Sequence, residues 1–99
     1  MNSDRVTAGI VTALRQAGAV VVYLDPEGGN GRGGLPDLLV THPRCGMKLL
    51  EVKSARGRLN DAQVAWHERW RAAGGGAVVV VRGVEDALRA VGLLPSEGS

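Results

Sequence analysis

The sequence predicts an α/β fold in which a mixed four-stranded sheet is flanked by helices. Three observations lead to this prediction: two short, continuous runs of β-branched apolar residues, a pair of apolar segments on either side of a polar turn, and three stretches with apolar residues at helical spacing. Their order along the chain is α-β-β-β-α-β-α. A meander of three strands followed by a helical crossover to a fourth strand gives a mixed sheet with helices on its faces.

The first third of the chain is expected to contain one helix, one strand and one long loop. Ser3 can cap a helix whose apolar residues recur at helical spacing until Gly18, a residue type that is common at helix ends. The run Ala19–Leu24 is continuously apolar and rich in valine, as in a buried strand. Residues 25–34 contain five glycines and one proline, so this segment is predicted to be a loop.

The rest of the chain is expected to add a hairpin, two helices and a fourth strand. Residues 35–43 and 47–53 are apolar segments on either side of a short turn, which predicts a β-hairpin. Residues 59–74 have the apolar spacing of a helix that ends in a run of glycines. Residues 77–82 repeat the pattern of a buried strand, and residues 84–91 form a short closing helix.

Size and composition are those of one small globular domain. We expect the 99 residues to form a single domain over residues 1–94, with a flexible tail at 95–99. The single cysteine, Cys45, excludes an internal disulfide and is interpreted as incidental. No apolar run approaches the roughly 20 residues that span a bilayer, and no secretion signal is visible, so a cytoplasmic protein without a membrane partner is expected. The net charge of +2 is compatible with a polyanionic partner.

Two acidic residues are expected to meet at one place in the predicted hairpin. Side chains alternate along a strand, so Glu51 and Lys53 share one face, and hairpin partners lie about 5 Å apart. Asp37, at the start of the first hairpin strand, can therefore converge on Glu51. Two carboxylates with open water positions suit Mg²⁺, which prefers oxygen ligands. A neighbouring lysine could orient a water or neutralise charge that develops on a phosphate.

Three polar residues, Glu51, Lys53 and Gln63, also have a purely structural interpretation. Glu51 and Lys53 could form a salt bridge on an exposed face of the sheet. Gln63 lies in one narrow helical stripe with two tryptophans, Trp66 and Trp70, which is an unusual place for an amide. It could belong to the site, or it could complete a capping box with Asn60, and the two roles do not exclude each other.

The other candidate residues carry a weaker signal. Arg32, Arg56 and Arg58 flank the expected site and could hold phosphates, or they could be solvated loop charges. The glycine-rich loop lacks the Lys-Ser/Thr ending of a phosphate-binding loop, so no nucleotide cofactor is expected. His42 and His67 show no metal-ligand spacing with the cysteine and are predicted to be surface residues.

A likeness to a known family is carried by four segments, in this order: GLPDLLV, LLEVK, GRLNDAQVAWHERWRAAG and AVVVVRGVEDAL. Together they resemble the PD-(D/E)XK nuclease superfamily and, within it, the small stand-alone VRR-NUC proteins of bacteria and phages. The resemblance covers roughly Val20 to Leu88 and rests on Pro-Asp, Glu-x-Lys and a helix glutamine at family-like spacing. It implies a restriction-endonuclease-like αβββαβ core and Mg²⁺- or Mn²⁺-dependent cleavage of DNA phosphodiester bonds.

The resemblance also implies a role for individual residues. Asp37 and Glu51 match the metal-binding acids of the family. Val52 matches the position whose backbone carbonyl completes the metal shell. Lys53 matches the catalytic lysine, and Gln63 matches the helix glutamine near the site.

Two features of the first third of the chain bear on this likeness. Asn30 and Gly31 resemble an Asn-x-Gly element that precedes the Pro-Asp, and we count Asn30 with the arginines as a DNA-binding candidate. Many relatives carry a glutamate in the first helix that supports a metal, whereas Asp4 is the only acid of that helix here. The likeness therefore leaves the number of metal ions at the site open.

The expected function is that of a DNA endonuclease selective for branched structures such as junctions or flaps. The alternative is a non-catalytic DNA-binding or assembly module that keeps the nuclease fold. We also expect a homodimer, because paired cuts on opposite strands require two sites. The predicted interface is the aliphatic surface of the closing helix and its end, which would otherwise serve only to close the core of the monomer: Val84, Ala87, Leu88, Val91, Leu93 and Leu94.

Overall fold

The computed structural model describes residues 4–24 and 34–95 and confirms the predicted order of elements. The predicted cap Ser3, the loop residues Asn30, Gly31 and Arg32, and residues 96–99 of the expected tail lie outside the described residues. The elements are α1 (Asp4–Gln16), β1 (Val20–Tyr23), β2 (Leu38–His42), β3 (Gly46–Val52), α2 (Asp61–Ala72), β4 (Val78–Val81) and α3 (Val84–Ala90). Of these helices, none is long and apolar enough to cross a membrane.

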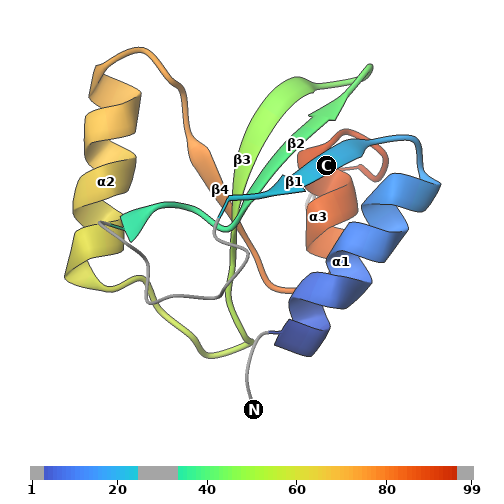
Figure 1. Cartoon of the computed structure of the whole chain (residues 1–99), viewed down its shortest axis with the longest axis horizontal. Helices are drawn as coiled ribbons and strands as arrows, with labels where there is room; N and C mark the ends of the chain where they lie inside the picture. Colours follow the sequence, from blue (N-terminus) through green and yellow to red (C-terminus); the bar gives the residue numbers. More distant parts are fainter. Residues whose placement is uncertain (1–3, 25–33, 96–99) are drawn as a thin grey trace.

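The four strands form one mixed sheet in the order β1-β2-β3-β4. β1 pairs with β2 and β2 with β3 in antiparallel fashion, whereas β3 and β4 run parallel. The parallel pair follows from the helical crossover, because α2 carries the chain from the end of β3 back to the edge of the sheet at which β3 began. Helices α1 and α3 lie side by side on one face of the sheet, and α2 stands on the other side (Figure 1).

The hydrophobic core lies between the sheet and the pair α1 and α3. Alternate residues of each strand point to this face, as the pleat of a strand requires. Aliphatic side chains of both layers are almost completely buried there, among them Leu38, Val40, Leu50, Val52, Val81, Ile10, Leu14, Ala87 and Val91. The predicted dimer surface is therefore wrong in part: Ala87 and Val91 belong to this core, and Leu88 and Leu93 pack against it.

The two valine-rich strands are edge strands, which corrects the prediction that both are buried. In β1 only Val21 is buried, whereas Val20 and Val22 expose 62% and 46% of their surface. In β4 only Val81 is buried. The continuous apolar runs suggested cover on both faces, but β1 and β4 end the sheet, and the face opposite the core is only partly covered.

His42 is buried at the end of β2, so its predicted place on the surface is wrong. Its Nδ1 accepts a hydrogen bond from the backbone N–H of Arg44 (3.1 Å), and its Nε2 lies 3.0 Å from the carbonyl oxygen of Ala17. Because Nδ1 acts as the acceptor, Nε2 must carry the proton and donate to that carbonyl. The ring thus joins the hairpin to the chain between α1 and β1 and has a structural role.

Candidate active site

Asp37 is fixed by its backbone and by its side chain, directly before the first residue of β2. Its N–H donates to the carbonyl of Leu50 (3.1 Å), and its own carbonyl accepts from the N–H of Leu24 (2.9 Å). Its Oδ2 accepts a hydrogen bond from the backbone N–H of Val52 (2.8 Å). The carboxylate therefore accepts a backbone hydrogen bond of β3 in the place of a carbonyl group from a neighbouring strand. This contact explains why an acid is tolerated at the head of an apolar strand.

Glu51 lies opposite Asp37, as the alternation of side chains predicts. Leu38 pairs with Leu50, so extending the antiparallel register by one residue places Asp37 across from Glu51, on the face turned away from the core. Glu51 is only 1% exposed. The pKa of this carboxyl is raised to about 8, first by burial and then by the hydrogen bond and the charge of Asp37, against the opposing charge of Lys53.

Gln63 reaches the acid pair from the first turn of α2 and has both of the roles that the sequence left open. Its Oε1 accepts from the N–H of Asn60 (2.9 Å), and its own N–H donates to Oδ1 of Asn60 (2.8 Å), which completes a capping box. Its Nε2 donates to Oε2 of Glu51 (3.3 Å). One amide therefore fixes the start of the helix and holds one oxygen of the buried acid.

Gly34 explains how the start of α2 comes so close to the site. This residue has a φ of 84°, a conformation that favours glycine. A Cβ at this position would collide with the backbone carbonyl of Ala62 in the first turn of α2. The glycine at the head of GLPDLLV thus brings the segment that carries Asp37 against the helix that carries Gln63.

His67 also belongs to the candidate site, so its predicted place on the surface is wrong. It is 8% exposed, and its Nε2 lies 3.1 Å from Oε1 of Glu51. Burial, and then the charges of Arg71 and Lys53, lower the pKa of the imidazole, while the pKa of Glu51 is raised. Near pH 7 and without a bound cation, the contact is thus a hydrogen bond between neutral groups and not an ion pair.

The periodicity of the helix could have predicted the position of His67, but the two tryptophans drew attention to a neighbouring stripe of the helix. His67 follows Gln63 by four residues and therefore shares its face of the helix. These two are the buried residues of α2. Trp66 and Trp70, which share a helical stripe with Gln63, are half-buried and stack on each other with ring centroids 5.3 Å apart.

Lys53 directly follows β3 and projects on the same side of the sheet as Glu51. Its N–H donates to the carbonyl of Val81 (3.0 Å), which extends the parallel ladder. Its charge influences the pKa values of both Glu51 and His67, so the ammonium group lies near the acid pair. Among the described residues, however, Lys53 and Glu51 do not form a salt bridge, and Glu51 contacts His67 instead.

Comparison with known proteins identifies the family. The family model of the VRR-NUC domain matches residues 3–85 of this chain. The chain belongs to the VRR-NUC domain family. A solved structure described as a VRR_NUC domain is also similar, with 32% sequence identity and a TM-score of 0.68 over 88% of this chain and 90% of that chain. No curated protein matches. The predicted resemblance to this nuclease family and the predicted fold class are thus confirmed.

The oxygen donors of this VRR-NUC site fit a divalent cation such as Mg²⁺. Asp37 and Glu51 crowd two carboxyl groups together, and burial and the neighbouring Asp37 raise the pKa of Glu51 even though the charge of Lys53 opposes the shift. Among residues 4–24 and 34–95, no group of three or more His, Cys, Asp and Glu side chains could hold a metal. Two carboxylates, a main-chain carbonyl such as that of Val52, and several waters are nevertheless a shell typical of Mg²⁺.

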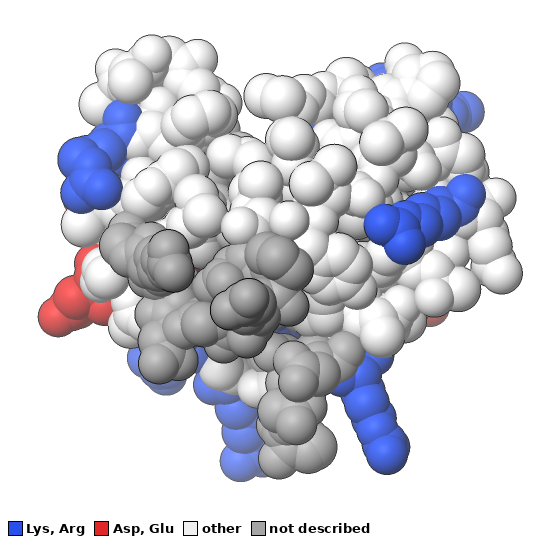
Figure 2. All heavy atoms as spheres, in the orientation of Figure 1, with Lys and Arg blue, Asp and Glu red and all other residues white. Residues whose placement is uncertain are grey.

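Basic side chains of the segment between β3 and α2 line a hollow that borders the acid pair. Arg56 and Arg58 line an open hollow of about 860 Å³ together with Arg82, which the sequence analysis did not single out. Val80 also lines this hollow and pairs with Glu51 in the sheet register, so the hollow borders the site. Figure 2 shows Lys and Arg side chains that project from the lower edge of the molecule, along which this segment runs in Figure 1.

Proposed function

We propose that this VRR-NUC chain is a Mg²⁺- or Mn²⁺-dependent endodeoxyribonuclease that hydrolyses phosphodiester bonds in branched DNA. The single observation that carries this proposal is the acid pair. Glu51 is 1% exposed, lies opposite a second carboxyl group and has its pKa raised to about 8, so this carboxyl group lowers the stability of the fold when it is charged. This loss of stability is understandable if the pair binds a cation and a phosphate.

The side chains of the site divide the chemical work. Asp37 and Glu51 would hold the cation, with the carbonyl of Val52 as a further ligand. When bound there, the cation supplies Lewis-acid polarisation of a phosphate oxygen. Lys53 would neutralise charge that develops on the phosphate during cleavage. Gln63 and His67 each hold one oxygen of Glu51 and thereby fix the orientation of this carboxylate.

Selectivity for DNA shape is favoured by the small size of the domain. Its largest extent is 33 Å, about one turn of duplex DNA. A surface of this size can contact few base edges but many phosphates, and phosphate contacts read geometry and not sequence. A junction or a flap presents an arrangement of phosphates that a plain duplex lacks.

We also propose a homodimer, because a junction requires two cuts in symmetric positions. The supporting surface is on the sheet and not on α3. Val20 and Met47 both pair with Thr41, so they lie on the same face of the sheet, and Val22 lies on this face as well. All three are among the most exposed large apolar residues of the described chain, as is common at interfaces. Light scattering should give twice the mass of one 10.3 kDa chain, and a monomer mass that persists with junction DNA contradicts the dimer.

The test of the proposed function is a cleavage assay with a panel of labelled DNAs. Four-way junction, flap, duplex and single-stranded substrates are incubated with Mg²⁺, Mn²⁺ or EDTA. We expect cleavage of the branched substrates with either metal and none in EDTA. Binding of these DNAs without cleavage under any metal condition would instead support the non-catalytic module.

A further inference from the structure

Arg82 directly follows β4 and lies beside the segment that carries Lys53. Val52 pairs with Val81 in the parallel register, so the following residues, Lys53 and Arg82, leave the sheet side by side. The N–H of Lys53 donates to the carbonyl of Val81 (3.0 Å). The backbone that carries the lysine is therefore tied directly to the residue before Arg82.

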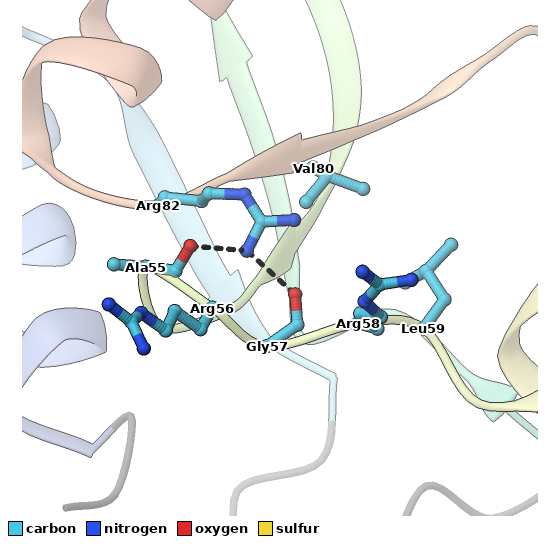
Figure 3. A pocket seen from close by; sticks show the side chains of 7 residues that line it. All are labelled: Ala55, Arg56, Gly57, Arg58, Leu59, Val80 and Arg82. Carbon is cyan, nitrogen blue, oxygen red and sulfur yellow. Dashed lines mark hydrogen bonds between the residues drawn. The ribbon is translucent and has the colours of Figure 1, made fainter.

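The guanidinium of Arg82 holds the turn that follows Lys53. Residues 54–57 form a tight turn, closed by a hydrogen bond from the N–H of Gly57 to the carbonyl of Ser54 (3.1 Å). Nη1 of Arg82 donates to the carbonyls of Ser54 (2.6 Å) and Gly57 (2.7 Å). It also lies 3.5 Å from the carbonyl oxygen of Ala55, and Figure 3 draws its contacts with Ala55 and Gly57. The two short bonds use both hydrogens of this nitrogen.

The positive charge of Arg82 is not cancelled by an acid among the described residues. Asp86 accepts a hydrogen bond from the backbone N–H of Arg82 (2.9 Å), but the guanidinium itself donates to carbonyl oxygens. Arg56, inside the turn, and Arg58, directly after it, are exposed and line the same hollow, and none of the described residues that line it is acidic. Three guanidinium groups around one hollow attract an anion with several oxygen atoms.

We infer that Arg82 is a positioning residue that fixes the turn 54–57, so that Arg56 and Arg58 bind a phosphate of the DNA backbone beside the one that is cleaved. The inference rests on the proposed function, because it names the part of the substrate that the hollow receives. A fixed turn removes the conformational freedom that loop arginines would otherwise lose on binding. The turn follows Lys53 without a gap, so the same hydrogen bonds also set the place of the lysine relative to that phosphate.

The experiment is a DNA-binding titration without cleavage. Binding of labelled junction DNA in EDTA is measured by fluorescence anisotropy over a range of salt concentrations, for the wild type and for Arg56→Gln, Arg58→Gln and Arg82→Gln. Loss of one phosphate contact should raise Kd by about eightfold at about 0.1 M salt. It should also make the plot of the logarithm of the binding constant against the logarithm of the salt concentration shallower by about 0.9. We expect this result for Arg56→Gln and for Arg58→Gln.

The role of Arg82 is tested by coupling and by rescue. If Arg82 acts through the turn, Arg82→Gln raises Kd, and in its background the other two substitutions cost less than about threefold each. Arg82→Lys, which keeps a charged donor near the carbonyls, should restore most of the affinity. The matched control is Arg44→Gln, because Arg44 also donates to a backbone carbonyl, that of Gly92, but at the opposite end of β3.

The outcomes separate this inference from the proposed function. If the wild type neither binds nor cleaves any DNA, the proposed function fails and the inference with it. If the wild type cleaves DNA but the substitutions at Arg56 and Arg58 weaken binding no more than Arg44→Gln does, the inference alone is overturned. Strictly additive losses for Arg82 and Arg56 would also overturn it, because they would show that Arg82 acts independently of the turn.

Discussion

The substitution Glu51→Gln should stabilise the metal-free protein, and the gain should depend on pH. The pKa of Glu51 is about 8 in the folded chain, against an ordinary value of 4.5. The folded state therefore binds this proton more tightly than the unfolded state does. The stability that the protonated carboxyl contributes is complete below pH 4.5 and is lost as the pH rises towards 8. Glutamine has no proton to lose, and its amide can pair with Gln63 and with neutral His67.

The size of the effect follows from the shift in pKa. Each unit of difference is worth about 1.4 kcal/mol, so charging Glu51 near pH 7 costs the fold at most about 3 kcal/mol. Relaxation of the protein and water penetration around a buried charge lower this penalty, so we expect about 1–2 kcal/mol. For a domain of this size, that corresponds to a rise in Tm of about 5–15 °C for Glu51→Gln.

Thermal melts in EDTA from about pH 5 to about pH 8 measure this difference, because the proton linkage acts across that range. Glu68→Gln is the matched control, since Glu68 is an exposed glutamate of α2. We expect the Tm of Glu51→Gln to exceed that of the wild type increasingly with pH, whereas Glu68→Gln follows the wild type. Parallel Tm curves for Glu51→Gln and the wild type would refute the interpretation of the acid pair as an uncompensated site.

Three further predictions concern the metal, His67 and the helix cap. Mg²⁺ should raise the Tm of the wild type but not that of Asp37→Asn, because only the intact pair binds the cation; equal shifts in both proteins would place the ion elsewhere. His67→Ala should require about 10–100-fold more Mg²⁺ for the same stabilisation and cleavage, because Glu51 loses the partner of its Oε1, and an unchanged Mg²⁺ midpoint would show that His67 does not orient the acid. Asn60→Ala should lower the free energy of unfolding by about 1 kcal/mol through loss of the capping box, and an unchanged denaturant midpoint would contradict this.

Local patterns were sufficient to predict the fold and the centre of the site. Strand alternation places Glu51 and Lys53 on one face, and the hairpin brings Asp37 opposite Glu51, so both steps depend only on residues that are close in the sequence or in the ladder. The burial of β1 and β4 was not predictable in this way. A valine-rich run has the same composition in a central strand and at an edge, and the position in the sheet depends on the whole topology.

The residues that the sequence analysis missed act through contacts between distant segments. His67 is 16 residues from Glu51, and its role requires that α2 turn its polar face to the sheet, which Gly34 permits by its close approach to Ala62. Arg82 acts on the backbone carbonyls of a turn 25–28 residues earlier. Carbonyl acceptors are present at every residue, so no sequence motif marks such a contact.

The central claim is that Asp37 and Glu51 form the catalytic metal site of a nuclease, and single-turnover cleavage of a labelled four-way junction tests it most directly. Wild type, Asp37→Asn and Glu51→Gln are compared with Mg²⁺ and with Mn²⁺, after thermal melts have shown that all three are folded. We expect metal-dependent cleavage by the wild type and none by either variant, although both variants are isosteric and keep the fold. Cleavage by Glu51→Gln at the wild-type rate with Mg²⁺ would show that Glu51 is not a ligand of the catalytic metal.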